Sequence, residues 1–337
     1  MNELTDYSLP ERYEIEEVIE ALLDEQTTLD PKYLYTLSDL RPKQLRKLKE
    51  IWDAISVERR RALLEDLEAL TEADTLLSYE AVFRFAIEDP DPQVRFYAVR
   101  AIEVFDTDDL VSTFLSLLLE DESEDVRAVS ASVLGKYVYR GELDKIEDEK
   151  QRRIVDRLLE VLRSGDTRRV RRRALEAVSY SPRAEVHQEI QDAYQRQEPE
   201  WIASALFAMG RSYDMRYREV VEDRLRDESP LVRMEAVRAC GELQIEDVHD
   251  ELLDLLDDVP RVRRAAIWSL SQVGGEGVQY ALNRLLEEEH LPAEEIDLIQ
   301  QALDNLAFTE GSVNYSMFDM PYAEDEGGEL PDQDWLD

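Results

Sequence analysis

The chain has few of the residues on which disulfide-bonded, zinc-bound or phosphate-binding folds depend. Its 337 residues include one cysteine, three histidines and 11 glycines. Cys240 alone cannot form an intramolecular disulfide, and a zinc site built from a cysteine cluster is excluded. No apolar run reaches the length of a membrane helix, and no signal-peptide pattern opens the sequence. We therefore expect a cytoplasmic protein without a membrane partner.

Basic residues are scarce relative to acidic ones. The chain has 40 Lys and Arg against 78 Asp and Glu, which gives a net charge of −38. A charge of this size repels nucleic acid and anionic lipid over most of the surface, so we expect no nucleic-acid partner. Apolar residues still make up 43% of the chain, which is enough to form a core.

One short phrase recurs six times between residues 89 and 266. It consists of an acidic turn, a Val-Arg-like pair and small or aliphatic residues at helical spacing. The Val position falls at Val94, Val126, Val170, Trp201, Val232 and Val262. A period of 30 to 32 residues, once lengthened to 44, is typical of stacked helix pairs. Because neither strand alternation nor a glycine-rich phosphate loop appears, the sequence predicts an all-α fold, an α-α superhelix.

Three segments are expected. Residues 1–73 have helical periodicity without the phrase and form a helical N-terminal cap, residues 74–308 form about seven helix pairs, and residues 309–337 form an acidic, disordered tail. The extra residues of the long interval, 137–149, are predicted to be a surface loop. Prolines are expected at helix starts, and Gly135, Gly210, Gly241 and Gly274 at or just past helix ends.

The pattern Asp-x-x-x-x-Val-Arg-x-x-Ala resembles the HEAT repeat, in particular the short subtype that also occurs in phycobilin lyases. The resemblance covers residues 75 to about 290 and implies a solenoid. It leaves function open, because scaffolds, lyases, iron hydroxylases and DNA glycosylases share the fold. The His-Glu pairs of the hydroxylases are absent here, since His187, His249 and His290 precede Gln, Asp and Leu. We expect no metal and no cofactor.

The resemblance further implies a ladder in which each helix arginine reaches a turn carboxylate of its own or the adjacent unit. The ladder would comprise Asp89, Arg95, Asp121, Arg127, Asp166, Arg171, Asp227, Arg233, Asp257 and Arg263. In the fourth unit Trp201 and Ile202 replace the Val-Arg pair, so an interruption is expected there. These residues are interpreted as framework.

The second helix of each HEAT pair lines the concave groove, so by resemblance the positions two, three and six residues after each Val point into it. The candidate partner-binding residues are Phe96, Tyr97, Arg100, Arg172, Arg173, Phe207, Met234, Arg238, Arg264 and Trp268. Arginine and large apolar side chains are typical of interface anchors. An alternative interpretation places some of these aromatics in the core.

Two charged segments complement each other. Between Arg152 and Arg173 lie nine arginines and three acids, which form either a solvated face or an anion-binding patch. The C-terminal tail (309–337) carries nine acidic residues, no Lys or Arg, and several aromatic residues. It could bind this chain's own groove, face a partner or only keep the protein soluble.

These patterns favour a non-enzymatic scaffold or adaptor that binds a protein segment, either acidic or mixed in charge, in the concave groove. No residue set with catalytic spacing stands out, so no catalytic residue is assigned. The alternative is a lyase-type enzyme or a chromophore-attachment factor of the HEAT-like lyase group.

Overall fold

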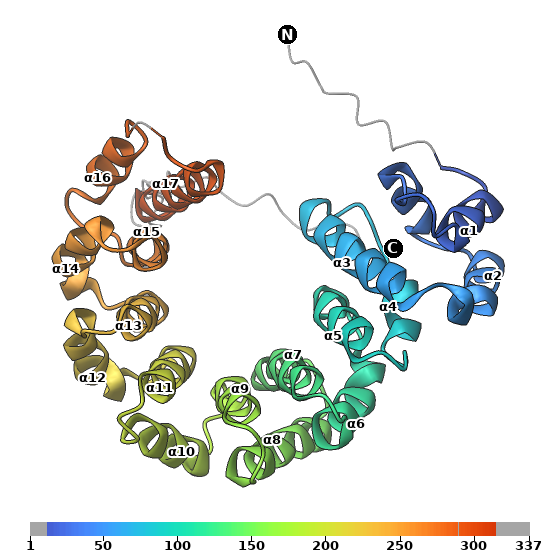
Figure 1. Ribbon diagram of the computed structural model, residues 1–337. Helices are drawn as coiled ribbons and strands as arrows, with labels where there is room; N and C mark the ends of the chain where they lie inside the picture. Colours follow the sequence, from blue (N-terminus) through green and yellow to red (C-terminus); the bar gives the residue numbers. More distant parts are fainter. Residues whose placement is uncertain (1–11, 289, 315–337) are drawn as a thin grey trace, which may run out of the picture.

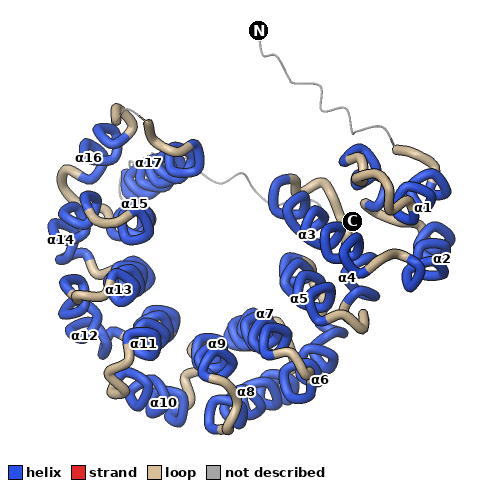
Figure 2. The backbone as a smooth tube through the Cα atoms, in the orientation of Figure 1, coloured by secondary structure: helices blue, strands red, loops and turns tan. Residues whose placement is uncertain are grey.

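The computed structural model describes residues 12–288 and 290–314, which form an arc of helices (Figure 1). Within these ranges every regular element is a helix and none is a strand (Figure 2). The all-α prediction is therefore confirmed. None of the described helices is long and apolar enough to cross a membrane.

The N-terminal part consists of three α-helices and two short 3-10 helices. Their bounds are α1 (Ile15–Leu23), η1 (Pro31–Leu37), α2 (Pro42–Ile51), η2 (Trp52–Ala54) and α3 (Val57–Ala73). Helix α3 packs along α5 and thereby opens the inner row of the arc (Figure 1). The N-terminal part thus covers the first repeat with α3, which takes the position that an inner helix of a preceding repeat would have.

Seven helix pairs follow, each with an outer and an inner member. The outer helices are α4 (Glu80–Ala86), α6 (Val111–Glu120), α8 (Asp148–Arg163), α10 (Ala184–Tyr194), α12 (Arg218–Asp223), α14 (His249–Asp254) and α16 (Val278–Leu285). The inner helices are α5 (Pro92–Ala101), α7 (Glu124–Glu142), α9 (Arg168–Val178), α11 (Pro199–Arg211), α13 (Pro230–Glu242), α15 (Pro260–Val273) and α17 (Ala293–Asn314). Six 3-10 helices adjoin these elements: η3 (Ile102–Val104), η4 (Asp108–Leu110), η5 (Met215–Tyr217), η6 (Arg224–Arg226), η7 (Glu246–Val248) and η8 (Leu255–Asp257).

The core lies between the outer and the inner row. The valine of the repeated phrase is at most 1% exposed in every unit that has one, because it begins the apolar stripe that faces the outer helix. The inner helices α5, α7, α9, α11, α13, α15 and α17 line the concave side of the arc in order (Figure 1). Side chains opposite the valine stripe therefore share one continuous concave face.

Local sequence explains where the inner helices begin. Helices α5, α11, α13 and α15 each start with proline, at the position where a missing N–H leaves no hydrogen bond unmade. Asp91 additionally caps α5, because its carboxylate accepts the backbone N–H groups of Gln93 and Val94 at 3.1 Å each.

The predicted glycine positions are confirmed at three helix ends and wrong at one. Gly274 is the C-cap of α15, and Gly210 and Gly241 are the penultimate residues of α11 and α13, whereas Gly135 lies seven residues before the end of α7. Gly135, Gly210 and Gly241 belong to α7, α11 and α13. A Cβ added at Gly210 would lie 2.9 Å from the Cα of Ala239, and one at Gly135 would lie 3.1 Å from the Cα of Ala177. Glycine is required at Gly210 because the neighbouring inner helix approaches too closely for a side chain, whereas at Gly135 an added methyl group would be tightly packed.

Two predicted segment boundaries also differ from the structure. Of the extra residues 137–149 only 143–147 form a loop, because α7 continues through Glu142 and α8 begins at Asp148. Tyr137 is buried, and its hydroxyl lies 2.8 Å from that of Thr107. Helix α17 continues through Asn314, six residues into the predicted tail, while residues 315–337 lie outside the described residues.

We predict that Gly210→Ala destabilises the protein by about 1 to 2 kcal/mol, because overpacking against the Ala239 backbone outweighs the helix propensity gained. Urea unfolding followed by circular dichroism measures the change. Gly165→Ala is the matched control, since nothing lies within 4 Å of its added methyl group. Equal midpoints for the two variants would contradict the close-approach explanation.

Candidate functional site

The arginine of the repeated phrase binds two units at once. Arg95 donates from Nη1 to the backbone carbonyls of Asp89 and Pro90 in its own turn, at 2.8 and 2.9 Å. Its Nε and Nη2 donate to the two carboxylate oxygens of Asp121 in the next turn, both at 2.8 Å. We call this arrangement the arginine clamp. A planar guanidinium suits it, because one edge can bind a carboxylate with two parallel bonds.

The same clamp recurs twice. Arg127 binds the carbonyls of its own turn and the carboxylate of Asp166, whose pKa is lowered by these hydrogen bonds. Arg233 binds its own turn and a carboxylate of the next unit, at 2.7 Å for both oxygens. That carboxylate belongs to Asp258, so the assignment of Asp257 to the ladder is wrong.

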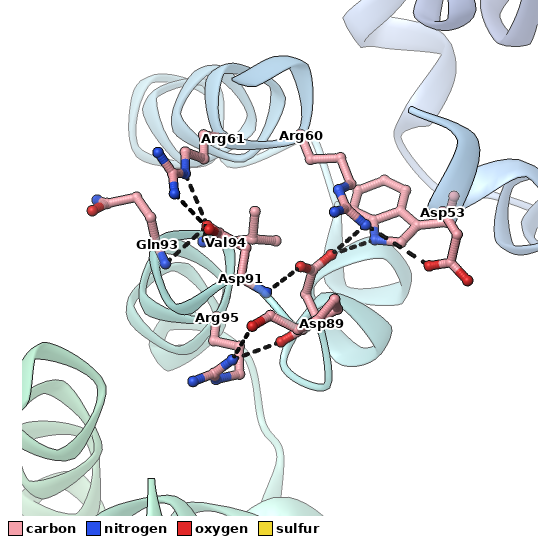
Figure 3. A network of polar contacts seen from close by, with 10 residues as sticks. Asp53, Arg60, Arg61, Asp89, Asp91, Gln93, Val94 and Arg95 are labelled. Carbon is pink, nitrogen blue, oxygen red and sulfur yellow. Dashed lines mark hydrogen bonds and ion pairs between the residues drawn. The ribbon is translucent and has the colours of Figure 1, made fainter. Parts of the chain in front are cut away.

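At the N-terminal end the row is closed by a buried network that joins the cap to the first repeat (Figure 3). The Asp89 carboxylate, fully buried, lies 3.2 Å from Nη1 of Arg60 and accepts the indole N–H of Trp52 at 2.6 Å. Arg61 holds Asp91 through two further hydrogen bonds (Figure 3). Asp89 therefore pairs with the cap and not with Arg95, which uses only its backbone carbonyl.

At the other end Arg263 pairs with Glu295, a residue that is 1% exposed, at 2.6 Å. Between the clamps the row is interrupted in the fourth unit. Arg171 has no carboxylate partner in the described residues; it donates to the carbonyl of Leu162 at 2.8 Å and lies 5.5 Å from the ring centre of Trp201. Ile202 stands where the next clamp arginine would be, and Asp227 is the carboxylate that this arginine would bind. Asp227 instead accepts a hydrogen bond from Arg224 of its own unit.

The concave face holds a pocket of about 560 Å³ between α11, α13, α15 and α17, which we call the concave pocket. Its apolar lining consists of Phe207, Met234, Ala239, Ala265, Trp268 and Leu298. Its charged lining consists of Arg211, Glu235, Arg238, Glu242, Arg261 and Arg264. Five of the ten predicted partner-binding residues meet here: Phe207, Met234, Arg238, Arg264 and Trp268.

The pocket is cationic although the protein is strongly acidic. Four arginines face two glutamates, and two of the arginines are already paired: Arg211 with Glu242 at 3.3 Å and Arg238 with Glu235 at 3.3 Å. Arg261 and Arg264 are exposed and have no ion pair within the described part of the chain. The pocket can therefore offer two guanidinium groups next to the ring of Trp268.

Glu235 is the one carboxylate of the pocket that burial affects strongly. It is 8% exposed, and its Oε2 is buried without a hydrogen-bond partner among the described residues. Burial raises the pKa of Glu235 to about 7, against the opposing effect of Arg238, and the nearby Glu176 raises it further. This carboxyl group is thus partly neutral near pH 7, which leaves the arginines less compensated.

The other predicted groove residues form two separate arrangements. Arg172 donates to Ser204 at 2.8 Å, Ser204 donates to Glu176 at 2.6 Å, and Arg173 pairs with Glu176 at 2.5 Å. Burial lowers the pKa of Arg172. This network joins α9 to α11, so both arginines are occupied by structural contacts.

Phe96, Tyr97 and Arg100 lie at the far end of the arc from the pocket, on α5. The rings are 5.7 Å apart and Arg100 lies over them, at 4.8 Å from the centre of Phe96. Arg100 also holds Glu68 of α3 through two hydrogen bonds of 2.5 Å. All ten predicted residues lie on inner helices, yet the structure gathers only five of them into one pocket.

The basic stretch from Arg152 to Arg173 does not form one patch. Its members are divided between the outer helix α8 and the inner helix α9 with the turn between them. Five of its arginines are paired with carboxylates: Arg157, Arg163, Arg168, Arg169 and Arg173. The interpretation as a continuous anion-binding patch is therefore wrong.

A model of HEAT repeats matches residues 80–179, 187–271 and 218–303, well over half of the chain. The chain belongs to the HEAT-repeat family. No curated protein matches it.

Several solved structures resemble this HEAT protein in fold. The YibA protein of E. coli is 17% identical, with 81% of this chain and 95% of that chain covered and a TM-score of 0.42. The complex of CpcE and CpcF of phycocyanin lyase from Nostoc is 18% identical, with 67% and 94% covered and a TM-score of 0.44. Importin beta is 13% identical, with 87% and 48% covered and a TM-score of 0.41. At these identities the likeness concerns the solenoid alone.

Sequence reasoning missed three charged residues of the pocket: Arg211, Glu242 and Arg261. Arg211 and Glu242 each lie ten residues after the Val position, one helical turn beyond the +6 position that the groove pattern already included. Extending the pattern by one turn would have found both. Arg261 precedes its valine, where no groove position was expected.

We predict that Arg233→Ala destabilises the protein by about 1 to 3 kcal/mol, because the Asp258 carboxylate and the turn carbonyls lose their donors together. Thermal and urea unfolding measure the loss. Arg226→Ala is the control, since that side chain is 83% exposed and makes one contact at 3.5 Å. An unchanged midpoint for Arg233→Ala would show that the clamp does not stabilise the array.

We predict that Glu235→Gln makes stability less dependent on pH. A folded pKa of about 7 against an ordinary 4.5 means that the folded state retains a proton that the unfolded chain releases. Wild-type stability should fall by about 2 to 3 kcal/mol relative to the variant as pH rises from 5 to 8. Urea midpoints at both pH values measure this, with Glu246→Gln, an exposed glutamate, as control. Parallel pH dependence in all three proteins would disprove it.

Proposed function

We propose that this HEAT protein is a non-enzymatic scaffold or adaptor, and that its concave pocket binds a protein segment carrying acidic and large apolar side chains. One observation supports this above the others: Arg261 and Arg264, exposed and without an ion pair among the described residues, lie beside the half-buried Trp268 on a protein of net charge −38. Aromatic and arginine side chains in a concave site are typical interface anchors. The apolar floor supplies area, while the guanidinium groups select carboxylates.

The proposal narrows the predicted set of binding residues to the pocket. Arg172 and Arg173 bind Ser204 and Glu176 within the solenoid, and the cluster on α5 lies apart from the pocket. We therefore assign the partner to the five pocket residues of the predicted set: Phe207, Met234, Arg238, Arg264 and Trp268. The lyase-type alternative has support only from overall likeness to proteins such as CpcE and CpcF, and that is a likeness of fold. The cytoplasmic location stays a prediction from the sequence.

We predict that Trp268→Ala weakens binding of such a segment by about 2 kcal/mol or more, roughly 30-fold, without loss of helicity. The probes are four fluorescein-labelled octapeptides. Three contain Trp together with Asp, Asn or Lys, and the fourth contains Asp with Ala in place of Trp. Fluorescence anisotropy with the full chain gives each affinity, and the Asp-Trp peptide should bind best.

Tyr280→Ala is the matched control, because this 74% exposed aromatic lies on the outer helix α16. It should leave all affinities unchanged. Tightest binding of the Lys-Trp peptide, or equal affinities for wild type and Trp268→Ala, would disprove the proposed site.

A further inference from the structure

The helix that closes the concave pocket also leads into the acidic tail. Leu298 lines the pocket from α17, and that helix ends at Asn314. Sixteen residues at a rise of ~1.5 Å place the helix end about 24 Å from the pocket. Residues 315–337 thus start at a known distance from a cationic site, and they carry no Lys or Arg.

The distance discriminates between the aromatic residues of the tail. A chain of n residues spans at most ~3.4 Å × n, so Phe318, four residues beyond the helix, cannot reach the pocket. Tyr322 could do so only when nearly fully extended. Trp335 lies 21 residues beyond Asn314, and a flexible chain of that length has a root-mean-square span of roughly 25 Å. The effective concentration of a tethered ligand is greatest when this span matches the distance to be bridged.

Trp335 is also the aromatic with the most suitable neighbours. Asp332, Asp334 and Asp337 surround it, and Leu336 follows it. This composition complements the pocket, where Arg261 and Arg264 lack carboxylate partners in the described chain and Phe207, Met234 and Trp268 offer apolar surface.

We propose that the segment Asp332–Asp337 of this chain docks in the concave pocket, with Trp335 against Trp268 and its aspartates against Arg261 and Arg264. The inference rests on the proposed function, because it assigns an intramolecular occupant to the same site. Docking competes with an external partner: such a partner must displace the segment before it can bind, and a partner of higher affinity does so. The HEAT protein then has a groove that is closed to weak ligands.

The test is 19F NMR of the full chain labelled with 5-fluorotryptophan, in which Trp268 and Trp335 are observed together. The Trp335→Phe and Trp268→Phe variants assign the two signals. In the wild type we expect a broadened Trp335 signal. In the double variant Arg261→Glu/Arg264→Glu we expect the Trp335 signal to become narrow and the Trp268 signal to shift. Added salt should change the Trp335 signal of the wild type but not that of the double variant, because the ionic contact is already lost there.

The matched control is Arg152→Glu/Arg153→Glu on the outer helix α8, which removes the same charge from the basic stretch. It should leave both signals unchanged. A narrow Trp335 signal in the wild type, or a response to the α8 variant alone, overturns the docking.

One further measurement separates this inference from the proposed function. A synthetic peptide of residues 330–337 is added to the Trp335→Phe variant. If the tail is free in the wild type but the peptide shifts the Trp268 signal, the groove function stands and the intramolecular contact falls. If the peptide shifts nothing, both fall.

Discussion

The arrangement of this solenoid depends on the arginine clamp. In three units a guanidinium binds the carbonyls of its own turn and, through two parallel bonds, the carboxylate of the following turn. Apolar packing alone allows neighbouring helix pairs to slide or rotate, whereas a bidentate ion pair tolerates little displacement. The clamp side chains, arginines and aspartates together, are only 4 to 17% exposed, so solvent competes weakly for them. By fixing one unit against the next, the clamp also fixes which side chains meet on the concave face.

The interruption of the row coincides with the beginning of the concave pocket. At α11 the clamp arginine is replaced, and its junction with α13 depends on other contacts. Gly210 allows close approach to Ala239, and Arg211 pairs with Glu242 at 3.3 Å. Both contacts lie near the C-terminal ends of α11 and α13, away from the turn that the clamp would have held. Arg211 therefore serves two purposes, because it joins two units and lines the pocket.

The sequence predicted the repeat, the order of the helices and their concave face, because burial of valine every 30 to 32 residues depends only on helical periodicity. It could not distinguish Asp257 from Asp258, since the turn carries both residues and the spacing from the turn aspartate to the valine varies by one residue between units. Asp166 also lies four residues before its valine, as Asp258 does, and counting from that unit would have selected the right residue. Gly135 was misplaced because a close helix contact and a helix end require the same residue, and only tertiary structure tells them apart. The pocket was predicted only in part, since its members come from four inner helices and their meeting depends on the curvature of the arc.

The overall charge and the local charge act over different distances. The net charge of −38 repels an acidic segment from far away, but at physiological ionic strength this field is screened beyond ~8 Å. The proposed contacts between carboxylates of a bound segment and Arg261 or Arg264 form at hydrogen-bond distance beside apolar walls, where screening is weaker. Salt therefore reduces the repulsion at long range more than the attraction at contact. Under the proposed function, the acidic surface slows the approach of acidic chains and rejects them elsewhere, whereas the pocket retains a segment that carries both carboxylates and an aromatic ring. The proposed selectivity follows from this combination, because a segment that offers only charge lacks the apolar area to overcome the repulsion.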